Sequence, residues 1–91
     1  MFPKQVDGLE LNPAEDGATI YEPRTDRAHY LNPTAALVLE LCDGKTDAAE
    51  IARLLQSHFE LATPPQAEVE ALLSQFVDEG LVEDADPETL V

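Results

Sequence analysis

Segments that favour β-strands occupy the first third of the chain. Residues 8–11 alternate apolar and polar positions, as a half-buried strand does. Residues 18–22 and 27–31 are rich in β-branched and aromatic side chains, and polar turns containing proline or Asp-Gly separate the three segments. Because such short turns join antiparallel neighbours, we predict a three-stranded meander whose second strand is central and whose outer strands are edges.

A nearly all-apolar segment follows the third predicted strand directly. Asn32 is a typical N-cap, and Pro33 suits the first helical position, where its missing N–H costs nothing. Gly44 lies where the chain has to leave this helix and is expected to have a positive φ. Few positions between these signals are polar, so the helix is predicted to be buried at the centre of the domain.

Two amphipathic helices are predicted in the second half of the chain. Asp47 and Glu50 have the spacing of a capping box, and apolar positions then recur at helical spacing as far as residue 59. Thr63 and Gln66 repeat that spacing, with a proline expected at the first helical position. The same helical periodicity of apolar residues then continues from residue 69 to residue 77.

The last helix is predicted to end at Gly80, with Leu81 folding back on its final turn. We expect residues 1–7 to be a loose lead-in, residues 1–83 to form one domain, and residues 84–91 to be an acidic, disordered tail. The predicted class is α+β, winged-helix-like, with a three-stranded antiparallel sheet followed by three helices (βββααα).

Charge narrows the functional classes. The 91 residues include 19 acids and 5 bases, which gives a formal net charge of −14. Such a chain lacks the cations that replace phosphate counterions, so we expect no nucleic-acid partner. The acidic excess can serve solubility, or it can steer a basic partner. No apolar run approaches the ~20 residues that span a bilayer, and no secretory signal is present, so we expect a cytoplasmic protein that does not bind membranes.

Residues typical of catalysis are few and scattered. His29 and His58 lie on different predicted elements, and neither has a serine or cysteine at the spacing of a catalytic set. Cys42 is the lone cysteine and falls in the buried helix, where a core thiol is expected rather than a nucleophile. With no Cys/His cluster for zinc and no glycine-rich phosphate loop, we predict no enzyme activity, cofactor or metal.

Four short motifs carry a resemblance to a known family: Tyr30-Leu31-Asn32-Pro33-Thr34-Ala35, Leu41-Cys42-Asp43-Gly44, Glu50-Ile51 and Gly80-Leu81-Val82. They resemble those of the PqqD family, small winged-helix-like domains that serve as recognition elements for ribosomally made, modified peptides. The resemblance covers residues 9–83. It implies an adaptor that binds the leader of a precursor peptide and presents it to a modifying enzyme, often a radical S-adenosylmethionine (SAM) enzyme, in the biosynthesis of PQQ or a related product. Lasso-peptide pathways use the same motif, so the product stays open.

The resemblance also implies where the peptide binds: as an added strand on the third strand, leaning on the third helix. Taken alone, the strand can be an ordinary solvated edge, and the apolar stripe of the helix can face the core entirely. The functional alternative is that one flank, Leu72 or Leu73, lines a peptide groove. The candidate peptide-binding residues are Arg27, Ala28, His29, Tyr30, Leu31, Val69, Leu72, Leu73 and Phe76.

Two other functions fit the same layout. A winged-helix transcription regulator would read DNA with the third helix, but that helix carries no lysine or arginine and has four acids, Glu68, Glu70, Asp78 and Glu79. The second is a protein–protein adaptor or oligomerisation module without a peptide ligand. Neighbouring genes for a precursor peptide and a radical enzyme would distinguish it from a leader-binding adaptor.

Overall fold

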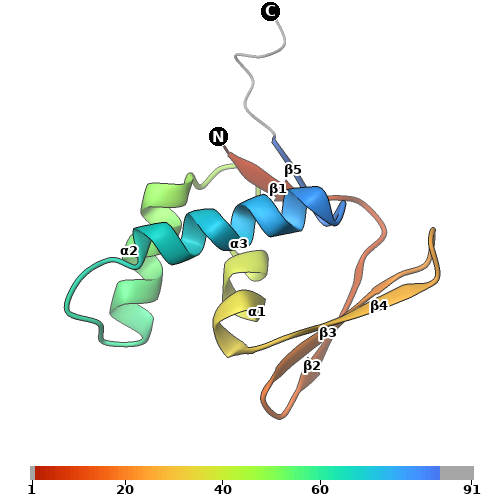
Figure 1. Ribbon diagram of the computed structural model, residues 1–91, viewed down its shortest axis with the longest axis horizontal. Coiled ribbons are helices and arrows are strands. Elements are labelled where there is room, and N and C mark those ends of the chain that lie inside the picture. Colours follow the sequence, from red (N-terminus) through yellow and green to blue (C-terminus); the bar gives the residue numbers. More distant parts are fainter. Residues whose placement is uncertain (1, 85–91) are drawn as a thin grey trace, which may run out of the picture.

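The computed structural model describes residues 2–84, which form five strands and three helices (Figure 1). The strands make two separate antiparallel sheets, one of three strands in the order β2-β3-β4 and one of two strands, β1 and β5. The elements are β1 (Pro3–Gln5), β2 (Glu10–Ala14), β3 (Gly17–Glu22), β4 (Arg27–Leu31), α1 (Pro33–Glu40), α2 (Ala48–His58), α3 (Gln66–Asp78) and β5 (Val82–Asp84).

The predicted α+β class is confirmed, with a three-stranded antiparallel meander and three helices. The central position of the second predicted strand is confirmed as well, because β3 lies between β2 and β4. The winged-helix comparison stays a prediction. The predicted turn after the first strand is too long: β2 continues through Asn12 and Pro13. Proline is tolerated there because β2 is an edge strand, where a missing N–H need not break the ladder.

The expectation of a loose lead-in is wrong, because β1 pairs with β5. Lys4 lies opposite Glu83, and the amide of Gln5 donates to the Cys42 carbonyl at 3.1 Å. These bonds tie the start of the chain both to its end and to the connection between α1 and α2. Asp84, the first residue of the predicted tail, pairs with Pro3, and residues 85–91 lie outside the described part of the chain.

Three of the five predicted helix-end signals, at Asn32, Asp47 and Gly80, act as predicted. Gly44 has the expected positive φ (81°), but α1 ends at Glu40 with Leu41 as its C-cap, so Gly44 lies beyond the end of the helix. Asn32 Oδ1 accepts a hydrogen bond from the Ala35 amide at 2.8 Å, and Asp47 Oδ1 accepts from the Glu50 amide at 2.9 Å. Gly80 has a φ of 75°, and the Leu81 amide donates to the Phe76 carbonyl, as predicted.

The capping box at Thr63 is wrong. Helix α3 begins at Gln66, its N-cap is Pro65 with ψ 61°, and no side chain caps its first turn. Two consecutive prolines explain the difference, since a residue that precedes proline is pushed out of the helical region. Pro64 is therefore kept outside the helix, and Thr63 is too far from the first turn to cap it.

Helix α1 is the centre of the core, as predicted, and it packs against the sheet and both other helices. Val38 and Leu39 are fully buried on it. On the sheet, Ala18, Ile20 and Leu31 face this helix and are buried. The predicted stripe of α2 is only partly confirmed. Its buried residues are Ile51, Ala52 and Leu55, whereas Leu54, His58 and Phe59 are exposed.

Gly17 fixes how closely β3 approaches the junction of β4 and α1. Its φ is 136°, and a Cβ at this position would lie 1.9 Å from the Leu31 carbonyl oxygen. We expect Gly17→Ala to lower the free energy of unfolding by at least about 2 kcal/mol more than Gly8→Ala. Gly8 is a matched control because its φ is also positive (91°) while nothing lies within 4 Å of its added Cβ. Urea unfolding followed by circular dichroism measures both, and equal losses would contradict the close approach.

Candidate functional site

The outer edge of β4 is the first component of the candidate site. β4 pairs with β3 along one side, and within residues 2–84 no strand pairs with its other side. Its side chains alternate between the two faces of the sheet. Leu31 is buried and His29 half-buried toward α1, whereas Ala28 and Tyr30 are exposed on the opposite face. β4 therefore presents unpaired backbone groups along its outer edge, while the side chains on one of its faces hold it against the rest of the domain.

His29 connects this edge strand to the end of α3. Its Nε2 lies 2.7 Å from Glu22 Oε1, and its Nδ1 lies 2.8 Å from Glu79 Oε2. The imidazole is only 13% exposed. Both contacts are hydrogen bonds with ionised carboxylates only when each ring nitrogen carries a proton. The contact with Glu79 joins β4 to the C-cap residue of α3, and the contact with Glu22 joins β4 to β3.

The contact between His29 and Glu79 shows which flank of α3 faces β4. Leu72 precedes Glu79 by seven residues, or about two helical turns, so both lie on the same side of the helix. Leu72 is half-buried, and it packs against the core while keeping some exposed surface. The Leu72 flank of α3 is therefore turned toward the side on which β4 lies, and for the surface between them we use the name β4–α3 groove.

The other predicted helix residues are buried rather than at the surface. Val69, Leu73 and Phe76 are at most 3% exposed and belong to the hydrophobic core. Val77, the last member of the predicted apolar stripe, is 44% exposed on the other flank. Among the candidate residues, the structure joins His29 of β4 to the end of α3 and turns Leu72 toward the same side of that helix, whereas Leu31 is buried. Arg27 is exposed where β4 begins.

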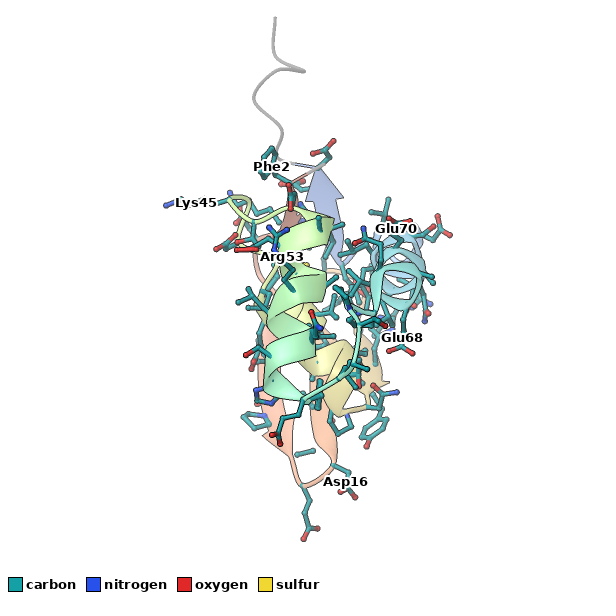
Figure 2. The ribbon with its side chains drawn as sticks, turned by 90° about the vertical axis from the view of Figure 1, so that its left-hand side faces the viewer. Phe2, Asp16, Lys45, Arg53, Glu68 and Glu70 are labelled. Atoms are coloured by element: carbon teal, nitrogen blue, oxygen red, sulfur yellow. The ribbon has the colours of Figure 1, made fainter. Side chains whose placement is uncertain are left out.

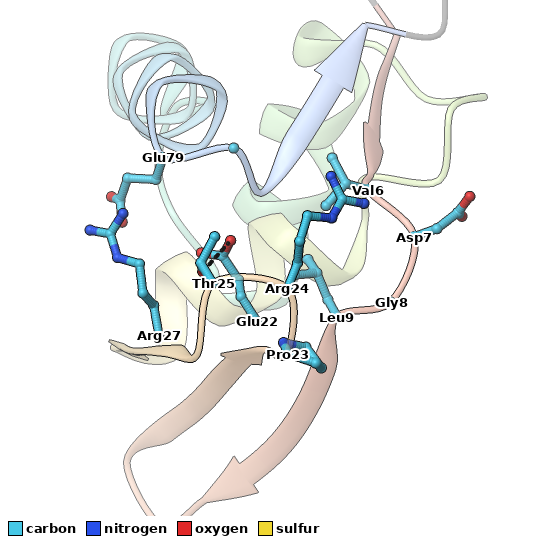
Figure 3. Close-up of a pocket in the computed structure, with 11 residues that line it drawn as sticks. Val6, Asp7, Gly8, Leu9, Glu22, Pro23, Arg24, Thr25, Arg27 and Glu79 are labelled. Atoms are coloured by element: carbon cyan, nitrogen blue, oxygen red, sulfur yellow. Dashed lines mark hydrogen bonds between the residues drawn. The ribbon is translucent and has the colours of Figure 1, made fainter.

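A pocket of about 390 Å³ lies where β4 begins. Three segments line it: residues 6–9, the turn between β3 and β4, and the end of α3 at Glu79 and Gly80. The side chains of Arg27 and Glu79 extend toward one another, and Arg24 projects from the turn (Figure 3). Sequence reasoning missed this pocket, because its walls come from segments up to about 70 residues apart and no local pattern connects them.

Cys42 is buried as predicted, at 2% exposure, and its Sγ donates to the Val38 carbonyl at 3.1 Å. Burial, and secondarily the charge of Asp43, raises the pKa of the thiol from 9.0 to about 12. We therefore expect iodoacetamide at pH 8 to alkylate the folded chain at least about 100-fold more slowly than the urea-unfolded chain, because little thiolate forms. Comparable rates, measured by mass spectrometry, would contradict this environment.

The same pKa difference has a consequence for stability. Below pH 9 the thiol is protonated in both the folded and the unfolded state, so its full contribution to the stability of the fold is present there. As the pH rises from 9 toward 12, the unfolded chain releases this proton first, and the folded state loses stability over that interval.

Within residues 2–84, no group of three or more His, Cys, Asp or Glu side chains is arranged to hold a metal ion. The helices of this described part are too short and too polar to cross a membrane. The chemistry that the arrangement does offer is backbone hydrogen bonding at β4, apolar contact at Leu72, and charge at Arg24, Arg27 and Glu79.

Comparison with known proteins relates this arrangement to others. A solved structure described as "Lasso peptide synthetase B1 complexed with the leader peptide" superposes with a TM-score of 0.71 at 17% sequence identity, covering 91% of this chain and 99% of that chain. At this identity the similarity shows a shared fold. None of the curated proteins compared with the chain matches it. The sequence model of the family described as "Coenzyme PQQ synthesis protein D (PqqD)" matches residues 17–82. That match extends from the start of β3 to the start of β5, and the chain therefore belongs to the PqqD family.

Proposed function

We propose that this chain is an adaptor that binds the leader of a precursor peptide and presents it to a modifying enzyme. The leader adds as a strand, antiparallel to β4, and places apolar side chains in the β4–α3 groove. The observation that carries the proposal is the open edge of β4 beside the Leu72 flank of α3. Main-chain pairing at such an edge provides affinity, and side-chain pockets beside it provide selectivity.

Two features favour β4 over β2, the other edge of the same sheet. β2 contains Pro13, which cannot donate a backbone hydrogen bond, whereas β4 has an amide at every residue. β4 also lies beside α3, to which His29 joins it. The solved structure of similar fold contains a leader peptide, which supports a peptide ligand for this fold.

Each part of the groove has its own role in this proposal. Residues 27–31 pair with the leader backbone, and Leu72 contacts its apolar side chains. Val69, Leu73 and Phe76 support the groove from the core. An antiparallel leader enters near Leu31 and leaves near Arg27, so its following residues pass the pocket lined by Arg24 and Glu79. The pocket then selects among residues just after the paired segment.

The adaptor itself catalyses nothing in this proposal. Its only two histidines are His29, held between two carboxylates, and His58, exposed on α2, while its one thiol is buried. The modifying enzyme supplies the chemistry, and family membership favours a radical SAM enzyme and PQQ biosynthesis or a related peptide pathway. Such an adaptor works in the cytoplasm, where precursor peptides are made.

Titration of a fluorescently labelled leader peptide, encoded beside this gene, tests the proposal. We expect a dissociation constant in the low micromolar range or tighter, which corresponds to about 8 kcal/mol of binding free energy. The control is a scrambled peptide of the same composition, which keeps the charge and loses the order of the side chains. No binding at roughly 50 μM, or equal binding of the scrambled peptide, would sink the proposal.

A further inference from the structure

A second groove lies on the opposite flank of α3, between that helix and the start of α2. Its volume is about 470 Å³, and its lining residues are Ala48, Glu70, Leu73, Ser74, Val77 and Asp78. Val77 lies five residues after Leu72, a rotation of about 140° around the helix axis. This α2–α3 groove is therefore separated from the β4–α3 groove by the body of the helix.

The lining of this groove combines an apolar floor with an acidic rim. Ala48, Leu73 and Val77 supply the apolar surface, and Val77 is 44% exposed although it is a large aliphatic residue on a regular helix. Glu70 and Asp78 supply two carboxylates, and none of the lining residues is basic. An exposed apolar surface rimmed by polar groups is typical of a protein interaction site.

We propose that the α2–α3 groove docks a basic, amphipathic segment of a protein partner. An apolar side chain of that segment packs on Leu73 and Val77, and flanking lysine or arginine side chains meet Glu70 and Asp78. A second copy of this acidic chain, with a net charge of −14, would be repelled at such a rim, so charge favours a basic partner instead. The inference does not rest on leader binding at β4, and the two grooves can be occupied together.

Two glutamates of α3 provide matched variants. Glu70 and Glu68 lie two residues apart and project to opposite sides of the helix (Figure 2). Both are exposed, and replacement of either by lysine changes the net charge equally. Only Glu70 lines the α2–α3 groove. A difference in peptide binding between Glu70→Lys and Glu68→Lys therefore measures an effect of the groove and not of the overall charge.

The probe is a synthetic 18-residue amphipathic helix of leucine and lysine, with a leucine–glutamate helix as its counterpart. In ¹⁵N–¹H spectra of the full chain, we expect the lysine peptide to shift the amides of Ala48, Ser74 and Val77 saturably, and the glutamate peptide to shift none. Glu70→Lys should weaken binding about tenfold or more, and Glu68→Lys by less than about twofold. Val77→Ser should weaken it about fivefold through the lost apolar contact.

Three outcomes would overturn the inference. Shifts spread over other acidic surfaces, such as the turn at Asp16, would indicate unspecific attraction. Equal effects of Glu70→Lys and Glu68→Lys on binding would show that the acidic rim of the groove does not bind the peptide. Concentration-dependent self-association in analytical ultracentrifugation, abolished by Val77→Ser, would make a second copy the occupant. Because none of these measurements uses a leader peptide, their failure leaves the proposal for β4 intact, and the reverse holds as well.

Discussion

Phe76→Ala is expected to lower the free energy of unfolding by about 3–5 kcal/mol, which is a large share of the roughly 5–15 kcal/mol that stabilises a domain. Phe76 is 1% exposed and is the largest of the fully buried side chains. Its carbonyl also accepts the amide of Leu81, which closes the end of α3. Removal of the ring leaves a cavity in the hydrophobic core. Urea unfolding at 25 °C, followed by circular dichroism, measures the loss.

Leu72→Ala separates a contact with the peptide from support of the fold. Leu72 is only half-buried, so we expect a stability loss of about 1 kcal/mol but a five- to tenfold weaker leader affinity, or about 1 kcal/mol of binding. Val77→Ala is the matched control, because it shortens an aliphatic side chain on the opposite flank of α3. It should leave leader affinity within about twofold. Equal affinity losses for Leu72→Ala and Val77→Ala would contradict the assignment of the flank.

Sequence reasoning predicted the elements whose determinants are local. Asn32 and Asp47 cap their helices through amides three residues away, and Gly80 ends α3 through a bond within the last turn. β4 was predicted with its observed bounds, because its residue types favour a strand and the Asn32 cap stops it. In each case the residues that cause the structural feature lie within a few positions of it, so the feature can be predicted from a short stretch of sequence.

The elements that sequence reasoning missed depend on distant partners. Pro3–Gln5 has no strand pattern of its own and becomes β1 only because Val82–Asp84 lies beside it, about 80 residues later. The contact between His29 and Glu79 joins residues that are equally unrelated in the sequence. It decides which flank of α3 faces β4, a question that the apolar periodicity of the helix left open, because Leu72 and Leu73 fit that periodicity equally well.

The candidate site, like the fold, could be predicted only in part. The assignment of a peptide site to Arg27–Leu31 and to the helix carrying Leu72 came from the resemblance to the PqqD family, and the fold joins the strand to the end of that helix through His29 and Glu79. The pocket beside Arg24 was not predictable, since it needs the path of the lead-in as well as the turn and the end of α3. The α2–α3 groove was not predictable for a similar reason: its lining combines Ala48, at the start of α2, with residues of α3 that lie more than 20 positions later in the sequence.

Binding of the leader peptide should slow hydrogen exchange along β4 by about 100-fold or more, but only at every second amide. In an antiparallel strand, successive N–H groups point to opposite sides, so about half of the amides in β4 already bond to β3. The remaining amides face the open edge, where water reaches them and exchange is fast. Strand addition pairs these amides with leader carbonyls and protects them, with an alternation along residues 27–31 that no other binding mode produces.

β2 provides the internal control for this measurement, because it is the other edge of the same sheet. Exchange along Glu10–Ala14 should stay within about twofold of its value in the free chain, since stabilisation of the whole fold would slow both edges together. Two leader analogues extend the test, each N-methylated at alternate residues, so that one blocks the leader amides that face β4 and the other blocks those that face away. The first should bind at least about fivefold more weakly than the parent leader, because each blocked hydrogen bond costs about 1 kcal/mol. The second should bind nearly as the parent leader does. Protection of β2 without β4, or uniform protection of every β4 amide, would exclude strand addition at this edge and would place the leader elsewhere on the domain.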